Sequence, residues 1–168
     1  MAGKVTIFTS EAFPNGMAGS NRIISLAKGF LSHGVLTEVI SFYKYADPGL
    51  NTLNPTEGSF EGVRFKNVFN SQTKSPCFPL RRIHEFLKPL LVLLAGLKSV
   101  ERNTVIIYYA EKTWPAVALK IVSLAKQAVL LREETEHPTL RTVNKRRIGT
   151  FLYLKFHYIL FDGLLVIT

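Results

Sequence analysis

The stretch that decides the fold is residues 4–42, KVTIFTSEAFPNGMAGSNRIISLAKGFLSHGVLTEVISF. Residues 5–8 are apolar and rich in β-branched side chains, which predicts a buried parallel strand. Between Ile23 and Leu31, apolar residues recur at the spacing of one helix face, and Gly34 provides the stop signal. A second strand pattern follows at 35–42. The stretch therefore predicts one βαβ unit with a right-handed crossover.

Strand and helix patterns alternate along the rest of the chain. Strand-like runs lie at 60–69 (two short strands or a hairpin about Glu61-Gly62), 104–109, 128–131 and 163–167, and helical patterns lie at 83–94, 117–125 and 140–161. This alternation predicts an α/β protein with a doubly wound, mostly parallel Rossmann-like sheet. Residues 1–168 are enough to form one domain with a full core. Because no helix pattern follows the last strand, we expect the chain to be part of a longer protein.

The chain is basic. Its 21 Lys and Arg residues outnumber its 12 Asp and Glu residues, which gives a formal net charge of +9. Such a surplus favours nucleic acid, anionic lipid headgroups or phosphorylated substrates as partners, or else it is a solvated basic surface. No RNA- or DNA-binding motif is present, so we expect no nucleic-acid partner. Cys77 is the only cysteine, which excludes an internal disulfide and fits a cytoplasmic location. The most apolar run, 90–97, is too short to cross a bilayer.

The loop after the first strand is the first candidate ligand-binding segment. Gly16 and Gly19 would allow the backbone to approach an anionic or hydroxyl-rich ligand closely, although they could also serve the turn alone. The candidate residues of the loop and the following helix are Asn15, Gly16, Gly19, Ser20 and Arg22. The glycine spacing is not G-x-G-x-x-G, the second strand ends without an acidic residue, and no Walker-type phosphate loop exists. These absences disfavour NAD and ATP.

The second candidate segment follows the strand at 128–131. Glu133, Glu136 and His137 are expected just beyond the carboxyl end of that strand, where α/β sheets bind ligands. There they could orient hydroxyl groups or transfer protons, or they could form a solvated charged loop. We assign them to binding and leave the catalytic residue unassigned. Paired-carboxylate glycoside hydrolysis stays open, because nothing in the sequence fixes the spacing that it needs. No metal site is expected.

A third candidate surface lies in the basic and aromatic helix pattern at 140–161. Its basic residues Arg141, Lys145, Arg146 and Arg147 precede several aromatic residues. This combination suits the surface of an anionic membrane, and the alternative is a core helix with solvated basic ends. The pattern predicts a cytoplasmic protein that can be peripheral on the inner face of the membrane.

Two motifs together resemble a known family. The first strand is followed by P-N-G-M-A-G-S, then by N-R-I-I-S-L-A-K-G-F-L-S-H-G and T-E-V-I-S-F, and a later segment reads Glu133-x-Thr135-Glu136-His137-Pro138. This order resembles the opening of the retaining glycosyltransferases of family 4, which have the GT-B fold. In that family the helix reads about R-x-x-x-L-A-x-x-L-x-x-x-G, and Arg22, Leu26, Ala27, Phe30 and Gly34 occupy these places. The family usually has His after the last Gly, where this chain has Val35. The later segment is similar to the E-x-T-E-Y-P segment of bacterial surface-polysaccharide members.

The resemblance implies that the chain is the N-terminal, acceptor-binding domain of an enzyme. That enzyme would transfer a sugar from a nucleotide sugar to a glycan or lipid-linked acceptor in polysaccharide biosynthesis. The loop residues from Asn15 to Arg22 would then contact the acceptor or the donor phosphate, and Glu133, Glu136 and His137 would line the acceptor side. A C-terminal donor-binding domain would lie outside this chain, no metal or other cofactor would be required, and the chain alone would be inactive. The alternative is a non-catalytic nucleotide- or polyanion-binding α/β module.

Overall fold

The computed structural model describes residues 3–16, 18–42, 55–68, 78–134 and 155–166 of the chain. The elements are β1 (Lys4–Thr9), α1 (Ala18–Ser32), β2 (Leu36–Ser41), β3 (Glu57–Phe60), β4 (Val63–Asn67), α2 (Phe78–Ser99), β5 (Val105–Tyr109), α3 (Thr113–Lys126), β6 (Val129–Glu134) and β7 (Gly163–Val166). A short helical turn at 155–158 precedes β7. The seven strands form one sheet in the order β3-β4-β2-β1-β5-β6-β7.

The sheet is parallel except at one edge, where β3 pairs antiparallel with β4. Counted along the chain, the parallel strands follow the order 3-2-1-4-5-6, which is compatible with a Rossmann-like fold. The predicted α/β class with a mostly parallel sheet is therefore confirmed. The strands that follow β1 up to β4 lie on one side of β1 in the sheet, and β5, β6 and β7 lie on its other side. The order consequently reverses between β1 and β5.

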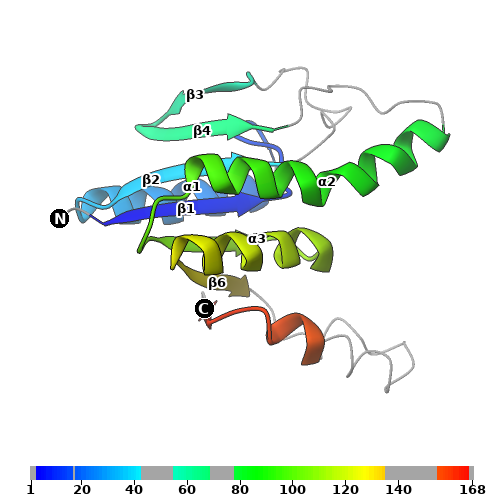
Figure 1. The fold of residues 1–168 in the computed structure, drawn as a ribbon. Coiled ribbons are helices and arrows are strands. Elements are labelled where there is room, and N and C mark those ends of the chain that lie inside the picture. Colours follow the sequence, from blue (N-terminus) through cyan, green and yellow to red (C-terminus); the bar gives the residue numbers. More distant parts are fainter. Residues whose placement is uncertain (1–2, 17, 43–54, 69–77, 135–154, 167–168) are drawn as a thin grey trace, which may run out of the picture.

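Helices cover both faces of the sheet (Figure 1). On one face, α1 packs its buried residues Ile23 and Ala27 over Ile7, Val39 and Ile107 of the strands. On the other face, α2 and α3 pack together over a second core. The members of this second core include Phe8, Ile40, Ile106, Leu130, Val92 and Leu119. Because adjacent strand residues point to opposite faces, neighbours such as Ile7 and Phe8 supply the two cores in turn.

The predicted hairpin about Glu61-Gly62 is confirmed. Glu61 and Gly62 join β3 to β4, and both have positive φ angles, 49° and 83°. Two successive residues with positive φ form the type of two-residue turn that matches the twist of paired strands. The hairpin adds one antiparallel strand to the edge of the parallel sheet.

β6 continues further than the sequence pattern predicts. The predicted strand ends at Leu131, but the observed strand includes Glu133 and Glu134, which are in register with Leu165 and Val166 of β7. Glutamate is depleted in strands, so the local pattern favours a loop here. The ladder to β7 supplies hydrogen-bond partners that keep the backbone extended. As a result, Glu133 points to the face that α1 covers, and Glu134 points to the opposite face.

Candidate functional site

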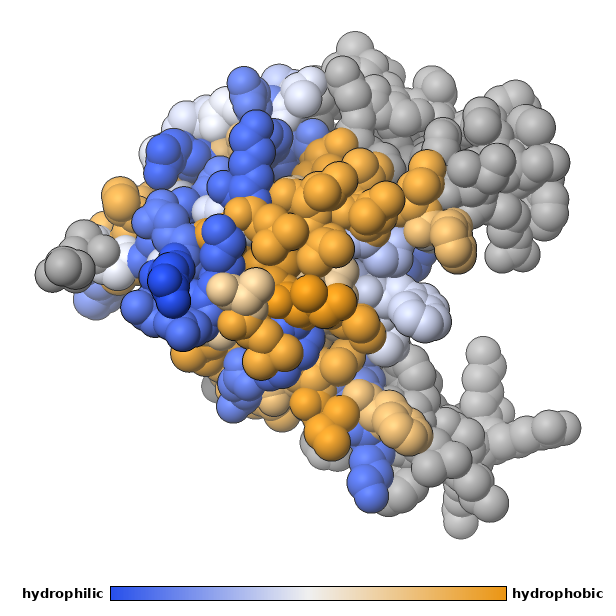
Figure 2. Space-filling model, in the orientation of Figure 1, coloured by the Kyte–Doolittle hydropathy of each residue, from blue (hydrophilic) through white to orange (hydrophobic). Residues whose placement is uncertain are grey.

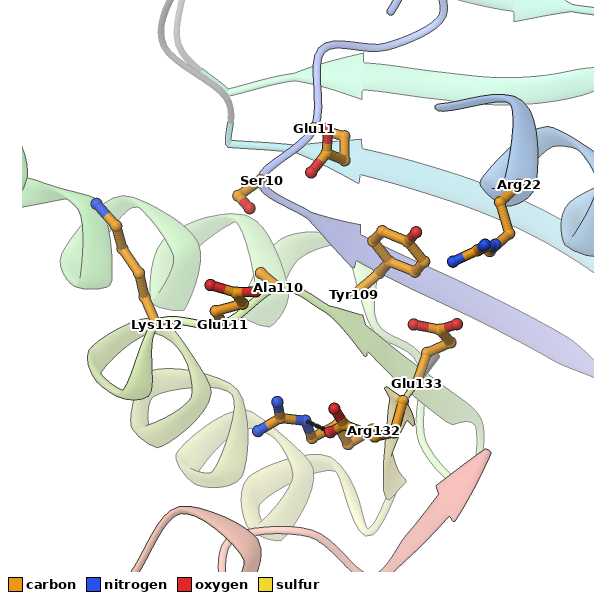
Figure 3. A pocket seen from close by; sticks show the side chains of 10 residues that line it. Ser10, Glu11, Arg22, Tyr109, Ala110, Glu111, Lys112, Arg132 and Glu133 are labelled. Carbon is orange, nitrogen blue, oxygen red and sulfur yellow. Dashed lines mark ion pairs between the residues drawn. The ribbon is translucent and has the colours of Figure 1, made fainter. Parts of the chain in front are cut away.

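A pocket of about 390 Å³ lies at the carboxyl ends of β1, β5 and β6 (Figure 3). Its lining residues are Ser10 and Glu11 after β1, Tyr109, Ala110, Glu111 and Lys112 at the end of β5, Arg132, Glu133 and Glu134 of β6, and Arg22 of α1. The strand order reverses between β1 and β5, and ligands of open α/β sheets bind outside the carboxyl ends of the strands at such a reversal. The fold therefore places this pocket where a ligand site is expected.

One side of the pocket is formed by Arg22, Tyr109 and Glu133, whose side chains converge (Figure 3). Burial raises the pKa of the Tyr109 hydroxyl, and the negative charge of Glu133 raises it further. Arg22 counters part of this effect through its charge and the hydrogen bond that it makes with the Tyr109 side chain. Glu133 is only 7% exposed. These three side chains offer a donor, a carboxylate acceptor and a neutral hydroxyl within one small space.

The other side of the pocket is built around Arg132. Its Nε lies 2.8 Å from Oε2 of Glu134, and the hydroxyl of Tyr158 donates a hydrogen bond to the same oxygen at 2.8 Å. The guanidinium also lies over the rings of Tyr158 and Phe161, 5.0 Å and 5.9 Å from their centroids. An ion pair combined with two aromatic faces fixes the orientation of a guanidinium. The outer nitrogen atoms of Arg132 consequently stay directed into the pocket (Figure 3).

His157 lies behind Arg132 and is fully buried. Its Nδ1 is 3.0 Å from Oγ1 of Thr113, the first residue of α3. Burial, followed by the positive charge of Arg132, lowers the pKa of His157 to about 4. The imidazole is therefore neutral near pH 7, and it connects the turn at 155–158 to the start of α3.

The segment between β1 and α1 is held by side chains from neighbouring strands. Oγ of Ser41 donates a hydrogen bond to the carbonyl of Glu11 at 2.7 Å, and Nδ2 of Asn67 donates one to the carbonyl of Phe13 at 2.9 Å. These bonds come from the ends of β2 and β4. They fix the direction in which the chain leaves β1, and so they position Glu11 at the pocket.

The structure separates the residues predicted for this loop. Arg22 lies in the pocket, but Asn15 and Gly16 line a different cavity of about 570 Å³, beside Phe60 and Glu61 of the hairpin. Ser20 is buried and donates its hydroxyl hydrogen bond to the carbonyl of Ala12.

Packing restricts Gly16, which precedes α1, strongly, and it restricts Gly19, in the first turn of α1, only against the flexible side chain of Glu11. A Cβ at Gly16 would overlap Oγ of Ser20 and the carbonyl oxygen of Ala12. A Cβ at Gly19 would lie 3.0 Å from Cδ of Glu11. The close approach that the glycines permit is therefore to the protein itself.

Of the predicted site residues, Arg22 and Glu133 come together in one pocket. Glu136 and His137, and the basic residues Arg141, Lys145, Arg146 and Arg147, lie outside the described residues. Sequence reasoning did not select Tyr109 and Arg132. Each lies at or near the carboxyl end of a strand, but only the strand order shows that β5 lies next to β1 and β6 next to β5. Knowledge of that order would have identified both residues.

Neither a metal-binding group nor a membrane-spanning helix is found in the part of the chain that the structure describes. No three His, Cys, Asp or Glu side chains there are grouped in a way that could hold a metal ion. Within the same ranges, every helix is too short or too polar to extend across a lipid bilayer.

The charges of the pocket nearly balance. Four carboxylates (Glu11, Glu111, Glu133 and Glu134) face three cations (Arg22, Lys112 and Arg132). Carboxylates accept hydrogen bonds, and guanidinium and ammonium groups donate them, so the lining can bind a ligand that both donates and accepts. A neutral, hydroxyl-rich molecule has this property. Comparison of the amino-acid sequence with protein-family models and with curated proteins finds no match.

Proposed function

We propose that the chain is the acceptor-binding domain of a retaining glycosyltransferase of GT-B architecture, with a doubly wound sheet. The complete enzyme would transfer a sugar from a nucleotide sugar to a glycan or lipid-linked acceptor in polysaccharide biosynthesis. The observation that carries the proposal is the pocket at the strand-order reversal, where Arg22 and Glu133 meet beside Tyr109. The sequence resemblance to family 4 supports the same assignment.

The lining of the pocket suits the hydroxyl groups of a sugar. Glu11 and Glu133 can each accept hydrogen bonds from ligand hydroxyls, while Arg22 can donate to the same groups. A hydrogen bond to a charged group is worth about 1.5–3 kcal/mol, so a few such bonds give useful selectivity. The Tyr109 ring adds an apolar surface on which a pyranose can lie.

In this proposal each domain binds one of the two substrates. This chain binds the acceptor, and a second domain binds the nucleotide and stabilises the departing diphosphate with basic groups and helix N-termini, without a metal or other cofactor. The isolated chain therefore binds its ligand without turnover. The enzyme would be cytoplasmic, with a nucleotide sugar and a glycan or lipid-linked acceptor as its partners, and without nucleic acid.

The charge of the pocket also separates this proposal from the alternative, a nucleotide- or polyanion-binding module. The lining has one carboxylate more than it has cations, so its net charge disfavours a polyanion, whereas a neutral glycan meets no net electrostatic repulsion. The substitution Glu133→Gln therefore has opposite effects in the two cases. It weakens binding of a hydroxyl-rich ligand that uses the carboxylate, and it strengthens binding of a phosphate-rich ligand that the carboxylate repels.

Calorimetric titration of the chain with a panel of neutral oligosaccharides, nucleotides and polyphosphate tests this. We expect an oligosaccharide to bind, and we expect Glu133→Gln and Arg22→Gln each to weaken that binding by about tenfold. Glu57→Gln, at an exposed position of β3, is the matched control and should change nothing. Binding of polyphosphate alone, made tighter by Glu133→Gln, would instead establish the alternative.

The activity is tested on the product of the full-length gene. A screen against nucleotide sugars, with release of the nucleotide as the readout, should find one donor whose turnover depends on an added acceptor. Glu133→Gln should raise the KM for the acceptor and leave that for the donor unchanged. A gene product that contains both domains and releases no nucleotide from any donor would refute the assignment.

A further inference from the structure

The face of the molecule covered by α2 and α3 exposes many large apolar side chains (Figure 2). We call this surface the α2–α3 face, and its members are Phe86, Leu87, Leu90, Leu94 and Leu97 of α2 and Trp114, Ile121 and Leu124 of α3. Phe86 is 85% exposed and Trp114 is 73% exposed. Soluble proteins rarely leave a continuous apolar surface of this kind uncovered unless it binds something.

Lysines are the charged residues of the segments that form this face, although Asp162 forms an ion pair with Lys120 and Lys88 is buried. Residues 86–99 of α2 contain Lys88 and Lys98, the whole of α3 contains Lys120 and Lys126, and neither segment contains Asp or Glu. An apolar helix surface bordered by lysines is typical of proteins that lie on anionic lipid. The complementary partner therefore carries negative charges over an apolar layer.

A cavity of about 770 Å³ opens at one end of the face, between the two helices. Pro89, Trp114 and Val117 give it apolar walls, and the lysines Lys88 and Lys112 also line it. This combination suits a lipid, with an acyl chain against the apolar walls and a phosphate near the lysines. Glu111 and Lys112 line both this cavity and the polar pocket of the candidate site, so the two are neighbours.

We propose that the α2–α3 face docks on the surface of a membrane that contains anionic phospholipids. The exposed Leu, Phe and Trp side chains enter the headgroup layer, and Lys98 and Lys126 contact lipid phosphates. Docking in this way holds the polar pocket beside the lipid surface. The surface is formed by helices other than the basic segment at 141–147 that the sequence favoured. The proposal is independent of the proposed transferase function, because the eight apolar side chains of the face are not part of the pocket.

A second copy of the chain fits this face less well. A symmetric dimer would bury the same face of both copies and bring the lysines of one copy toward those of the other. Such like-charge contacts are unfavourable, and residues 86–99 of α2 and the whole of α3 contain no Asp or Glu to offset them. Anionic lipid satisfies the apolar and the basic parts of the surface together.

The test is co-sedimentation of the whole chain with vesicles. We expect binding to phosphatidylcholine vesicles that contain phosphatidylglycerol, weakening with added salt, and little binding to phosphatidylcholine alone. The double variant Phe86→Ser/Trp114→Ser should lower the partition coefficient by at least about tenfold. Lys98→Gln/Lys126→Gln should lower it on the anionic vesicles alone.

Two controls match these variants. Leu36→Ser changes a 51% exposed apolar residue at the start of β2, and Lys28→Gln changes an exposed lysine on α1, across the sheet from the α2–α3 face. Both should bind vesicles as the unaltered chain does. The thermal midpoint of every variant, followed by circular dichroism, shows whether the fold is retained. Lys98→Gln/Lys126→Gln keeps the proposal testable if the apolar variant does not fold.

Three results would overturn the proposal. One is equal binding to neutral and anionic vesicles. Another is binding by the folded Phe86→Ser/Trp114→Ser variant at the level of the unaltered chain. The third is that the unaltered chain does not bind vesicles and forms a dimer in sedimentation velocity, and that this variant abolishes the dimer. A second copy of the chain would then be the occupant of the face.

Discussion

The charges of Glu133 and Arg22 change the pKa of Tyr109, and this effect can be measured without a ligand. The negative charge of Glu133 favours the protonated form of Tyr109, so Glu133→Gln should lower the pKa of the Tyr109 hydroxyl. Arg22→Gln should raise it, because the charge and hydrogen bond that favour the phenolate are lost. Ultraviolet titration of each variant, with Tyr109→Phe subtracted to isolate one phenol, measures both shifts. A Tyr109 titration that neither substitution moves would mean that the three side chains do not converge.

His157 makes stability depend on pH. Burial and the charge of Arg132 lower its pKa from 6.5 to about 4 in the folded chain. Between these two values the unfolded state binds more protons than the folded state, so the free energy of unfolding rises with pH. The contribution is complete above about pH 6.5 and disappears as the pH falls toward 4, and over that whole interval it amounts to roughly 3 kcal/mol.

Urea unfolding at about pH 7 and about pH 5 measures this contribution. The unaltered chain should lose stability at the lower pH, and His157→Gln should lose less. His33→Gln, at an exposed position at the end of α1, should behave like the unaltered chain. If the free energy of unfolding of His157→Gln depends on pH as strongly as that of the unaltered chain, groups other than His157 cause the dependence.

At the scale of elements, the contact between α2 and α3 depends on a glycine. A Cβ at Gly96 would lie 2.8 Å from Cγ2 of Val122, a fully buried residue of α3. The helices would have to separate, so Gly96→Ala should lower the free energy of unfolding by about 1–3 kcal/mol. Gly29→Ala is the matched control in α1, where a Cβ meets nothing within 4 Å. Since alanine is the better helix former, this control should gain about 0.5–1 kcal/mol. Equal stability of the two variants in urea would show that α2 and α3 are not in close contact.

Local patterns predicted most of the elements, because the buried strands and the amphipathic helices are readable within one segment. The βαβ unit at 4–42 and the turn at Glu61-Gly62 depend only on adjacent residues. The predicted end of β6 was wrong because its last three residues are kept extended by β7, about 30 residues later in the chain. No pattern within 128–134 contains that information.

The candidate site was only half predictable for the same reason. Arg22 and Glu133 were selected from the sequence, and the fold brings them together. Asn15 and Gly16 face another cavity, because the loop direction is set by Ser41 and Asn67, which lie 30 and 54 residues away from their partners Glu11 and Phe13. Tyr109 becomes a site residue only when β5 is known to pair with β1. Contacts between residues so far apart in the sequence follow from the strand order, and a local sequence pattern does not contain them.

Over the whole molecule, stability should decrease from the centre of the sheet to its edges. β1 and β5 are paired on both sides and carry mostly buried residues, whereas β3 and β7 are edge strands with many exposed positions. Amides in central strands exchange only when the molecule unfolds globally, and edge amides exchange through local opening. Hydrogen exchange followed by mass spectrometry should therefore find the slowest peptides in β1 and β5 and the fastest in β3 and β7. Since the residues after β1 and β5 line the pocket, the site would rest on the most stable part of the sheet. Exchange in β1 as fast as in β7 would contradict this order, and a pocket on so mobile a base could not hold Arg22, Tyr109 and Glu133 in a fixed arrangement for a ligand.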